Sequence, residues 1–452
     1  MKFGVKQYRK PMLALAIPII IQNLIDSTIS STDVIMLNFV GQDAISAVSL
    51  AANFSSIIFM VYYGLGTGIT MLGAQYYGKG DIKAIRVVHG IALRLSLIVS
   101  ALFAAGAFFM PRHMMYIFTK DETLIALGAS YLRYMGIAYI CWGVIEIFLS
   151  SMRCVGRVKT SMFLNLMAFG INIVLNATFI FGLFGAPKLG VAGVALGTAL
   201  SRVAELIGCI IVSLYSKDIH IDLKMMFVKN KVLFSDFRKM AMPALVNDII
   251  WGLAFSMYSV ILGHLGSDAV AANSLVSVVR NFGSIMCFAM ASGGTIYLGQ
   301  VMGEGRIDEA ADVAKELMFL TIVSAAIGSV IIAAAAPFAM MFADLTDTAM
   351  GYLKYMLMIN VYYIFGGAVN TTLIAGVFRA GGDSKYGMKV DVIDMWCYAV
   401  PLGFLSAFVL KLPVMWVYFL LCTDEFVKWP WVLRHYRSGK WIKNITREDW
   451  DK

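Results

Sequence analysis

Within the long apolar stretches of this sequence, a few side chains supply oxygen atoms that could bind a cation or a proton. Asp33 offers a carboxylate and Thr198 a hydroxyl. Asn172 and Asn176 offer amides four positions apart, a spacing that puts both on one face of a helix. Such donors hold Na⁺ or hydrogen-bond a protonatable acid. The alternative is that they only join helices through hydrogen bonds, each worth about 0.6 kcal/mol.

The elements that must position these residues are membrane helices. The sequence is 60% hydrophobic and only 14% charged, with a mean hydropathy of +0.77, whereas a soluble domain is nearer one quarter charged. Roughly twenty apolar residues span a bilayer as a helix. Twelve stretches of this kind occur, at 12–38, 44–72, 88–110, 123–150, 160–184, 190–214, 238–263, 269–297, 316–342, 348–378, 387–411 and 413–433. The sequence therefore predicts an all-α membrane protein.

The chain is a tandem duplication. A shift of 225 residues places Pro18 on Pro243 and Gly68 on Gly293, and most turn motifs follow the same shift. Each copy holds six predicted helices, so both copies enter the membrane in the same direction and the repeats are parallel. We expect an N-terminal six-helix lobe at 1–215, a cytoplasmic linker at 216–237, and a C-terminal lobe at 238–452 that ends in a basic tail.

The duplication also shows where the two halves differ. Tyr258 stands where the first copy has Asp33, so a carboxylate function at this place belongs to the first half alone. Asp26 lies seven residues before Asp33, on the same helix face, and we take Asp26 and Tyr258 as candidates for a substrate cavity. Pro18 should kink or loosen the first helix and act as its hinge. Alternatively, Asp33 only marks the outer end of this helix and touches water.

Charge predicts the orientation. Of the 37 Lys and Arg residues, 28 fall on one side: the N-terminus, every second helix connection and the tail. This excess marks the cytoplasmic side, so we expect a multi-pass protein of the plasma (inner) membrane with both termini inside. The net charge of +9 then reflects topology and attraction to membrane lipids, and does not indicate nucleic-acid binding. We expect a monomer.

Other classes of function lack their motifs. The six cysteines form no C-x-x-C pair, and no spacing of metal ligands or cofactor motif occurs, so we expect no cofactor and no metal beyond the coupling ion. No phosphate-binding loop is present, which leaves an ion gradient as the energy source. A membrane-embedded enzyme would need a clustered catalytic set, which five histidines without a motif do not supply.

Further acids lie in the predicted helices of the second half. Asp248 is a possible second-lobe coupling acid, with an ion pair to a basic group such as Arg280 as its alternative. We expect Asp391 and Asp394 to pair with basic residues of the 379–389 stretch. Three more charged residues, Asp424, Glu425 and Lys428, predict a charge cluster near the inner end of the last helix.

The ordered set of motifs resembles the multidrug and toxic compound extrusion (MATE) family over essentially the whole chain. The set comprises Pro18 with Asp33 fifteen residues later, Gly78-Lys-Gly80, Arg153-Cys-Val-Gly156, Asn172 with Asn176, Gly190-Val-Ala-Gly193 with Thr198, and Arg379-Ala-Gly-Gly-Asp383. The resemblance implies a V-shaped two-lobe fold and a transporter, not an enzyme. It also implies export of organic cations in exchange for H⁺ or Na⁺, by alternating access.

The same resemblance implies a coupling site in the N-terminal lobe, to which Asp33, Asn172, Asn176 and Thr198 correspond. Some members carry a second acid where this chain has Asn176, which leaves the choice between H⁺ and Na⁺ open. In some members the first helix bends at the residue matching Pro18. A flippase for lipid-linked oligosaccharides or lipid II, of the same superfold, is the alternative. Such a flippase would need a cavity rich in Arg and Lys, and often has two more helices.

Overall fold

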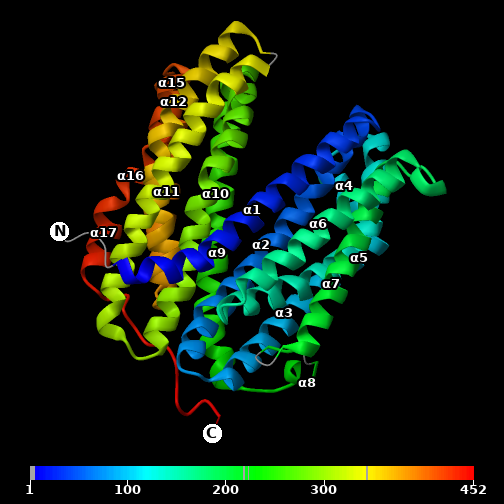
Figure 1. Cartoon of the computed structure of the whole chain (residues 1–452). Helices are drawn as coiled ribbons and strands as arrows, with labels where there is room; N and C mark the ends of the chain where they lie inside the picture. The colour runs from blue at the N-terminus through cyan, green and yellow to red at the C-terminus, as the bar shows by residue number, and fades with distance from the viewer. Residues whose placement is uncertain (1–5, 217–218, 222, 343–344, 452) are drawn as a thin grey trace. The chain divides into compact units, whose positions relative to one another are not determined.

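A computed structural model describes residues 6–216, 219–221, 223–342 and 345–451 (Figure 1). These residues form helices and turns and contain no strand. Eleven helical segments among them are long and apolar enough to cross a membrane. The prediction of an all-α membrane protein is confirmed.

The described residues of the first half form ten helical elements. They are η1 (Lys6–Tyr8), α1 (Arg9–Asn38), α2 (Gln42–Gly78), α3 (Ile82–Phe109), α4 (Pro111–Tyr116), α5 (Glu122–Cys154), α6 (Val158–Phe181), η2 (Leu183–Gly185), α7 (Val191–Tyr215) and α8 (Leu223–Met226). The second half contains α9 (Lys231–Leu265), α10 (Ser267–Gly303), α11 (Ile307–Phe342), α12 (Asp347–Asn370), η3 (Thr371–Phe378), α13 (Ser384–Val392), η4 (Ile393–Ala399), α14 (Val400–Phe404), η5 (Leu405–Val409), α15 (Val414–Leu421), α16 (Asp424–Val427) and α17 (Trp429–Arg437).

Several helices extend beyond the apolar stretches that predicted them, because capping rather than apolarity sets their ends. The third predicted stretch starts at residue 88, yet α3 begins at Ile82. The carboxylate of Asp81 accepts a hydrogen bond of 3.0 Å from the backbone N–H of Ala84, which satisfies a free donor of the first turn.

The twelfth predicted helix, at 413–433, is divided into α15, α16 and α17. At the first break Thr423 donates its hydroxyl to the Leu420 carbonyl at 2.6 Å, and Asp424 accepts the Glu425 backbone N–H at 2.7 Å. Side chains that bind nearby backbone groups in this way compete with the helical hydrogen bonds. The break places Asp424 and Glu425 in the protein interior, where both are buried.

Contacts divide the chain into two compact units. Unit 1 holds the residues up to Ile20 together with Met242–Thr446, and unit 2 holds Ile21–Ala241 with the last residues from Arg447. The helices α1 and α9 therefore each begin in one unit and continue in the other, and the changes fall close to Pro18 and Pro243. The predicted lobes at 1–215 and 238–452 describe the repeat and stay a proposal.

The start of α1 and the start of α9 each belong to a different unit from the rest of their helix, and we call them the exchanged helix starts. Both pack in the same way. In unit 1 a Cβ on Gly293 would lie 3.0 Å from the backbone nitrogen of Ala16. In unit 2 a Cβ on Gly68 would lie 2.6 Å from the Cβ of Ala241. These two pairs are related by the 225-residue shift. In each unit a glycine, on α10 or on α2, therefore leaves room for an exchanged helix start to pack closely.

The duplication also extends to the turns. Gly80 and Gly305, which follow α2 and α10, have φ angles of 79° and 82°. Only glycine adopts this left-handed region without a steric cost, so the repeated glycines end equivalent helices in equivalent turns.

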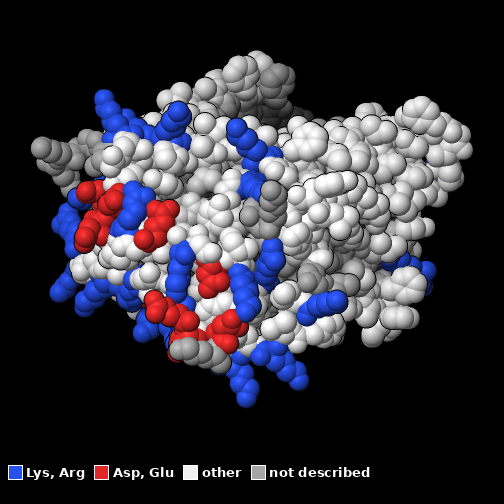
Figure 2. Space-filling view, turned by 60° about the horizontal axis from the view of Figure 1, so that its bottom comes forward, with Lys and Arg blue, Asp and Glu red and all other residues white. Residues whose placement is uncertain are grey.

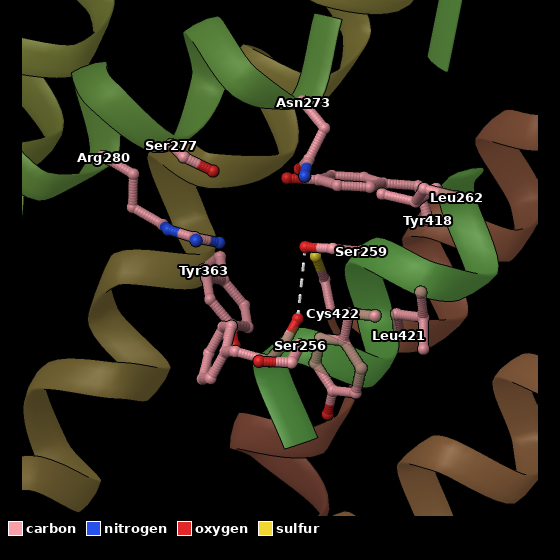
Figure 3. Close-up of a pocket in the computed structure, with 12 residues that line it drawn as sticks. Ser256, Ser259, Leu262, Asn273, Ser277, Arg280, Tyr363, Tyr418, Leu421 and Cys422 are labelled. Carbon is pink, nitrogen blue, oxygen red and sulfur yellow. Dashed lines mark hydrogen bonds between the residues drawn. The ribbon is translucent and has the colours of Figure 1, made fainter. Parts of the chain in front are cut away.

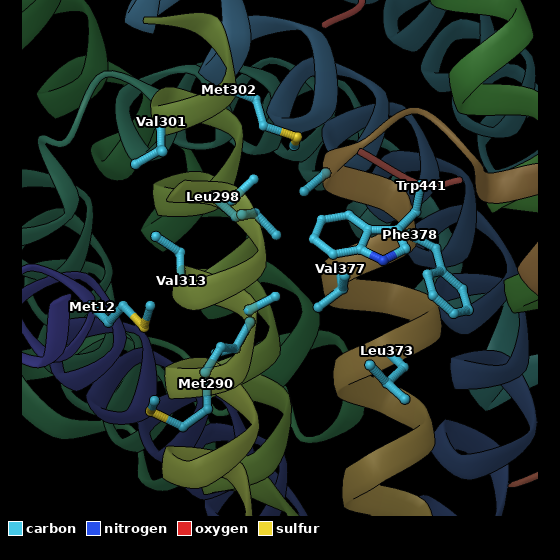
Figure 4. Packing of buried hydrophobic residues seen from close by; sticks show 14 of the residues in the cluster. Met12, Met290, Leu298, Val301, Met302, Val313, Leu373, Val377, Phe378 and Trp441 are labelled. Carbon is cyan, nitrogen blue, oxygen red and sulfur yellow. The ribbon is translucent and has the colours of Figure 1, made fainter. Parts of the chain in front are cut away.

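In unit 1, α10, α11 and α12 pack side by side (Figure 1). A buried cluster joins Met12 of α1 to Met290 and Leu298 of α10 and to Phe378 of η3, and Trp441 of the tail closes it (Figure 4). Polar contacts hold the exchanged start of α1 beside it. The hydroxyl of Tyr8 donates to Glu309 at 2.6 Å, and Arg9 pairs with Glu316 and stacks on Phe319 with 4.5 Å to the ring centroid.

In unit 2, α5 packs against α2, α3 and α7. The linker is partly helical: α8 lies on α3, where a Cβ on Gly90 would meet the Met225 carbonyl oxygen at 2.5 Å. The tail binds the same unit, since Arg447 pairs with Asp236 at 2.5 Å. Figure 2 shows basic and acidic side chains interleaved on the face that it views.

Candidate functional site

The four oxygen-bearing residues of the first half meet within unit 2. The amide of Asn176 on α6 donates to the Asp33 carboxylate of α1 at 2.7 Å, and also to the Asn172 carbonyl oxygen at 3.2 Å. Asn172 in turn donates to the Thr198 hydroxyl of α7 at 3.3 Å. Both asparagines are buried, and Asp33 is half-buried. We call Asp33, Asn172, Asn176, Thr198 and Ser201, which is described below in the text, the Asp33 group.

Local sequence explains how three helices bring these side chains together. The spacing of four puts Asn172 and Asn176 one above the other on α6. On α7, Gly197 allows the close approach, because a Cβ there would lie 2.2 Å from the Oδ1 of Asn176. Gly193, one turn earlier, faces the Phe179 carbonyl oxygen with 2.8 Å to a built Cβ. Small residues thus let α6 and α7 pack with their backbones close.

Ser201 belongs to the same group and was missed in the sequence. Its hydroxyl lies 3.5 Å from the Nδ2 of Asn172 and donates to the Thr198 carbonyl at 2.8 Å. The signal that could have found it is its spacing: Ser201 follows Thr198 by three residues, so both lie on one face of α7.

The Asp33 group offers a carboxylate, amide oxygens and hydroxyl oxygens around one place. Among the described residues the Oδ1 of Asn176 is buried and has no hydrogen-bond partner, so it is an acceptor that remains available. A hard monovalent cation or a proton on the carboxylate suits such a set of oxygens. No cluster of three His, Cys, Asp or Glu side chains that could hold a metal ion occurs in the described parts of the chain.

Charged residues follow Ser201 on α7, also within unit 2. Arg202 pairs with buried Glu205 at 2.7 Å and stacks on Trp142 with 5.0 Å to the ring centroid. Asp26 is exposed on α1.

Asp248 of α9 does not pair with Arg280. It binds Arg379, at 2.6 Å, where the chain leaves η3. Arg280 instead stacks on Phe255, with 5.3 Å between its guanidinium carbon and the ring centroid. The second carboxylate oxygen of Asp248 is buried and has no hydrogen-bond partner among the described residues. Asp248 is therefore bound to Arg379 through one carboxylate oxygen only.

A second polar group lies in unit 1 around Lys428, and we call it the Lys428 cluster. The ammonium is 3.2 Å from Asp391, 3.3 Å from Glu425 and 3.7 Å from Asp394. The prediction that Asp391 and Asp394 pair with basic residues of 379–389 was therefore wrong. Asp424 completes the cluster. All four carboxylates and the lysine are buried. The cluster therefore holds four acidic residues and a single lysine, which pairs with three of them.

Tyr258, the repeat partner of Asp33, belongs to this second group. Its hydroxyl donates to Asp424 at 2.8 Å, and the hydroxyl of Tyr363 lies 3.5 Å from the same carboxylate oxygen. Tyr258 also lines a cavity in unit 1. At equivalent places the two halves thus use a carboxylate in unit 2 and a phenol bound to a carboxylate in unit 1.

Comparison with known proteins identifies relatives that match most of this chain. A family model described as MatE matches residues 18–178 and 243–405, one segment in each half. Bacillus subtilis has a relative called "Uncharacterized transporter YisQ" that is 22% identical over 432 residues, which are 96% of this chain and 95% of YisQ. Thermotoga maritima has one called "Probable multidrug resistance protein NorM" that is 23% identical and covers 99% of this chain and 96% of its own.

Solved structures share the fold. A MOP superfamily transporter from Pyrococcus furiosus superposes with a TM-score of 0.85 at 18% identity, covering 96% of this chain and 97% of its own. The Vibrio cholerae MATE transporter VcmN superposes with a TM-score of 0.86 at 16% identity, covering 96% and 98%.

Proposed function

The chain belongs to the MatE family of membrane transporters, and we propose that it exports organic cations across the plasma membrane in exchange for H⁺ or Na⁺. It is a transporter and not an enzyme. The observation that carries the antiport proposal is the Asp33 group: a half-buried carboxylate that accepts a hydrogen bond from the amide of Asn176 at 2.7 Å, on a membrane helix.

An ionised carboxylate in this position attracts cations of either kind. A charge in the membrane interior costs at least about 2.5 kcal/mol, and a bound proton, Na⁺ ion or organic cation offsets that cost. The coupling ion and the organic cation therefore compete for a negative charge, which is the requirement for exchange. One elementary charge moved across 100 mV is worth about 2.3 kcal/mol, equal to about a 50-fold concentration ratio.

Pro18 supports alternating access as a hinge. It lies inside α1, two residues before the point where α1 passes from unit 1 to unit 2. Proline lacks the N–H that would bond one turn back, so α1 bends here at a lower cost than elsewhere. Occupation of Asp33, fifteen residues further along the same helix, is then linked to the bend through the helix itself.

The test is transport in vesicles with imposed Na⁺ or H⁺ gradients and a fluorescent organic cation as substrate. We expect efflux to follow one of the two gradients and to be lost in Asp33→Asn, which keeps the size of the side chain and removes its charge. The matched control is Asp43→Asn, because Asp43 is an exposed acid at the start of α2. Gradient-driven efflux at the wild-type rate in Asp33→Asn, at equal expression, contradicts the proposal.

A further inference from the structure

The cavity beside Tyr258 carries a charge opposite to that of the Asp33 group. It has a volume of about 250 Å³ and is lined by α9, α10, α12 and α15 together with Cys422, all within unit 1 (Figure 3). Its walls contain four aromatic rings, those of Phe255, Tyr258, Tyr363 and Tyr418. Among the described residues that line it, Arg280 of α10 is the one that carries a charge. This volume lies just below the range of about 300–1,000 Å³ that is usual for small-molecule pockets, so it fits a ligand of one or two rings.

A polar stripe on α10 aims at this cavity. Asn273, Ser277 and Arg280 follow one another at spacings of four and three residues, so they share one helix face, and all three line the cavity (Figure 3). The rest of this helix is mostly apolar or small. An ionisable residue inside a membrane helix, such as Arg280, marks a ligand path or an internal contact.

The hydrogen-bonding capacity of this stripe is not used up inside the protein. Among the described residues Arg280 takes part in no ion pair. Its partner is the Phe255 ring, which lies 5.3 Å from the guanidinium carbon. An aromatic ring engages the face of a guanidinium and leaves its in-plane N–H groups free to donate. Across the cavity the hydroxyls of Ser256 and Ser259 donate to the Gly252 and Phe255 carbonyls of their own helix, so their lone pairs remain as acceptors.

The nearby acid is shielded from the cavity. Asp424 accepts hydrogen bonds from the Tyr258 and Tyr363 hydroxyls, whose rings stand in the cavity wall. Asp424 is fully buried behind them. A ligand in the cavity therefore meets phenol rings and a guanidinium, and the tyrosines stand between the ligand and the carboxylates of the Lys428 cluster.

We propose that this cavity binds a small aromatic molecule through its carboxylate group. Arg280 pairs with the carboxylate in the planar, two-pronged geometry that a guanidinium offers. Asn273 and Ser277 add hydrogen bonds along the same face of α10, and the aromatic walls take the ring of the ligand. This site goes beyond the exchange of organic cations at the Asp33 group, and its binding requires neither ion gradients nor transport.

The test is equilibrium binding to the purified full-length protein in nanodiscs of phosphatidylcholine. Three matched probes differ only in charge: 2-naphthoate, its neutral amide 2-naphthamide, and 2-naphthylmethylammonium. We expect naphthoate to bind at least about tenfold more tightly than the other two, the value of one charge-assisted hydrogen bond. In Arg280→Gln this preference for naphthoate should vanish. Arg280→Lys should keep part of the preference, which would show that the positive charge, rather than the fold, is responsible.

Controls separate this site from the others. Arg133→Gln removes an exposed arginine of another membrane helix that does not line the cavity, and it should bind naphthoate like the wild type. Asp33→Asn should also bind it normally, so a failed antiport proposal leaves this one standing. Equal binding of all three probes, or unchanged naphthoate binding in Arg280→Gln, overturns the proposal. Displacement of naphthoate from the wild-type protein by phosphatidylglycerol in the nanodisc would assign the site to an acidic lipid headgroup and so also count against a soluble ligand.

Discussion

Replacing Gly197 by alanine tests the Asp33 group without altering any of its polar side chains. A Cβ at this position would lie 2.2 Å from the Oδ1 of Asn176 and 3.0 Å from its backbone nitrogen. Atoms do not approach so closely, so either the Asn176 side chain rotates away or α6 and α7 separate. In both cases Asn176 loses its place between Asp33 and Asn172.

The size of the effect follows from the contact that is lost. Asn176 donates to the Asp33 carboxylate at 2.7 Å, and a hydrogen bond to a charged group contributes about 1.5–3 kcal/mol. If the coupling ion binds among these oxygens, its apparent affinity should change by about ten- to 150-fold. We expect the rate of gradient-driven efflux at a limiting concentration of the coupling ion to fall by a similar factor.

Gly170→Ala is the matched control. Gly170 lies on α6, and no atom lies within 4 Å of a Cβ built there. Alanine inside a helix is favoured over glycine by about 1 kcal/mol, so this variant should be at least as stable as the wild type and equally active. Vesicle efflux of a fluorescent cation across a range of Na⁺ and H⁺ concentrations compares the two variants. Wild-type rates and ion dependence in Gly197→Ala would refute the assignment of coupling to the Asp33 group.

Two further predictions concern unit 1 and the orientation in the membrane. Lys428→Met leaves the buried carboxylates of its cluster without their cation, and breaking such a pairing costs about 3–5 kcal/mol. Thermal unfolding should show a melting temperature lowered by roughly 3–5 °C. Lys354→Met, at an exposed lysine of α12, should change the melting temperature little. An unaltered melting temperature in Lys428→Met contradicts the described pairing. For the orientation, single cysteines in place of Lys229 and Lys188 should react from the cytoplasm and from outside respectively, and labelling of position 229 by an impermeant reagent in intact cells would reverse the proposed topology.

The Asp33 group shows how far local spacing predicts a site. The distance of four between Asn172 and Asn176 fixes a shared helix face whatever the tertiary structure, and it survives in the structure as a direct hydrogen bond of 3.2 Å. Ser201 has the same kind of spacing to Thr198, but serine is common in helices that pack closely, so its hydroxyl carried no distinct signal. The partner of a half-buried acid such as Asp33 depends on how the helices pack. The resemblance to the MATE family was therefore needed to place Asn176 in one site with Asp33.

The ion pairs of unit 1 show where spacing fails. Arg379 follows the π-helix η3, and Asp394 lies inside a second one, η4. A π-helix adds a residue to each turn, so the rotation of about 100° per residue that places side chains on an α-helix no longer applies. Residues 379–389 and Asp391 therefore face different neighbours than sequence distance suggests: Arg379 binds Asp248, 131 positions earlier, and Asp391 binds Lys428.

The exchanged start of α1 has a consequence for how the protein is made. Ala16 packs against Gly293, which the ribosome adds about 280 residues later. At about 5–20 residues per second, the first turns of α1 wait on the order of 15–55 s for the helix that receives them. Unit 2 in turn gains Ala241 of α9 only after its own helices are complete. Neither hydrophobic core is complete when the first half has been synthesised. A chain that stops after α7 lacks the start of α9, which packs in unit 2, and we expect cellular quality control to recognise it.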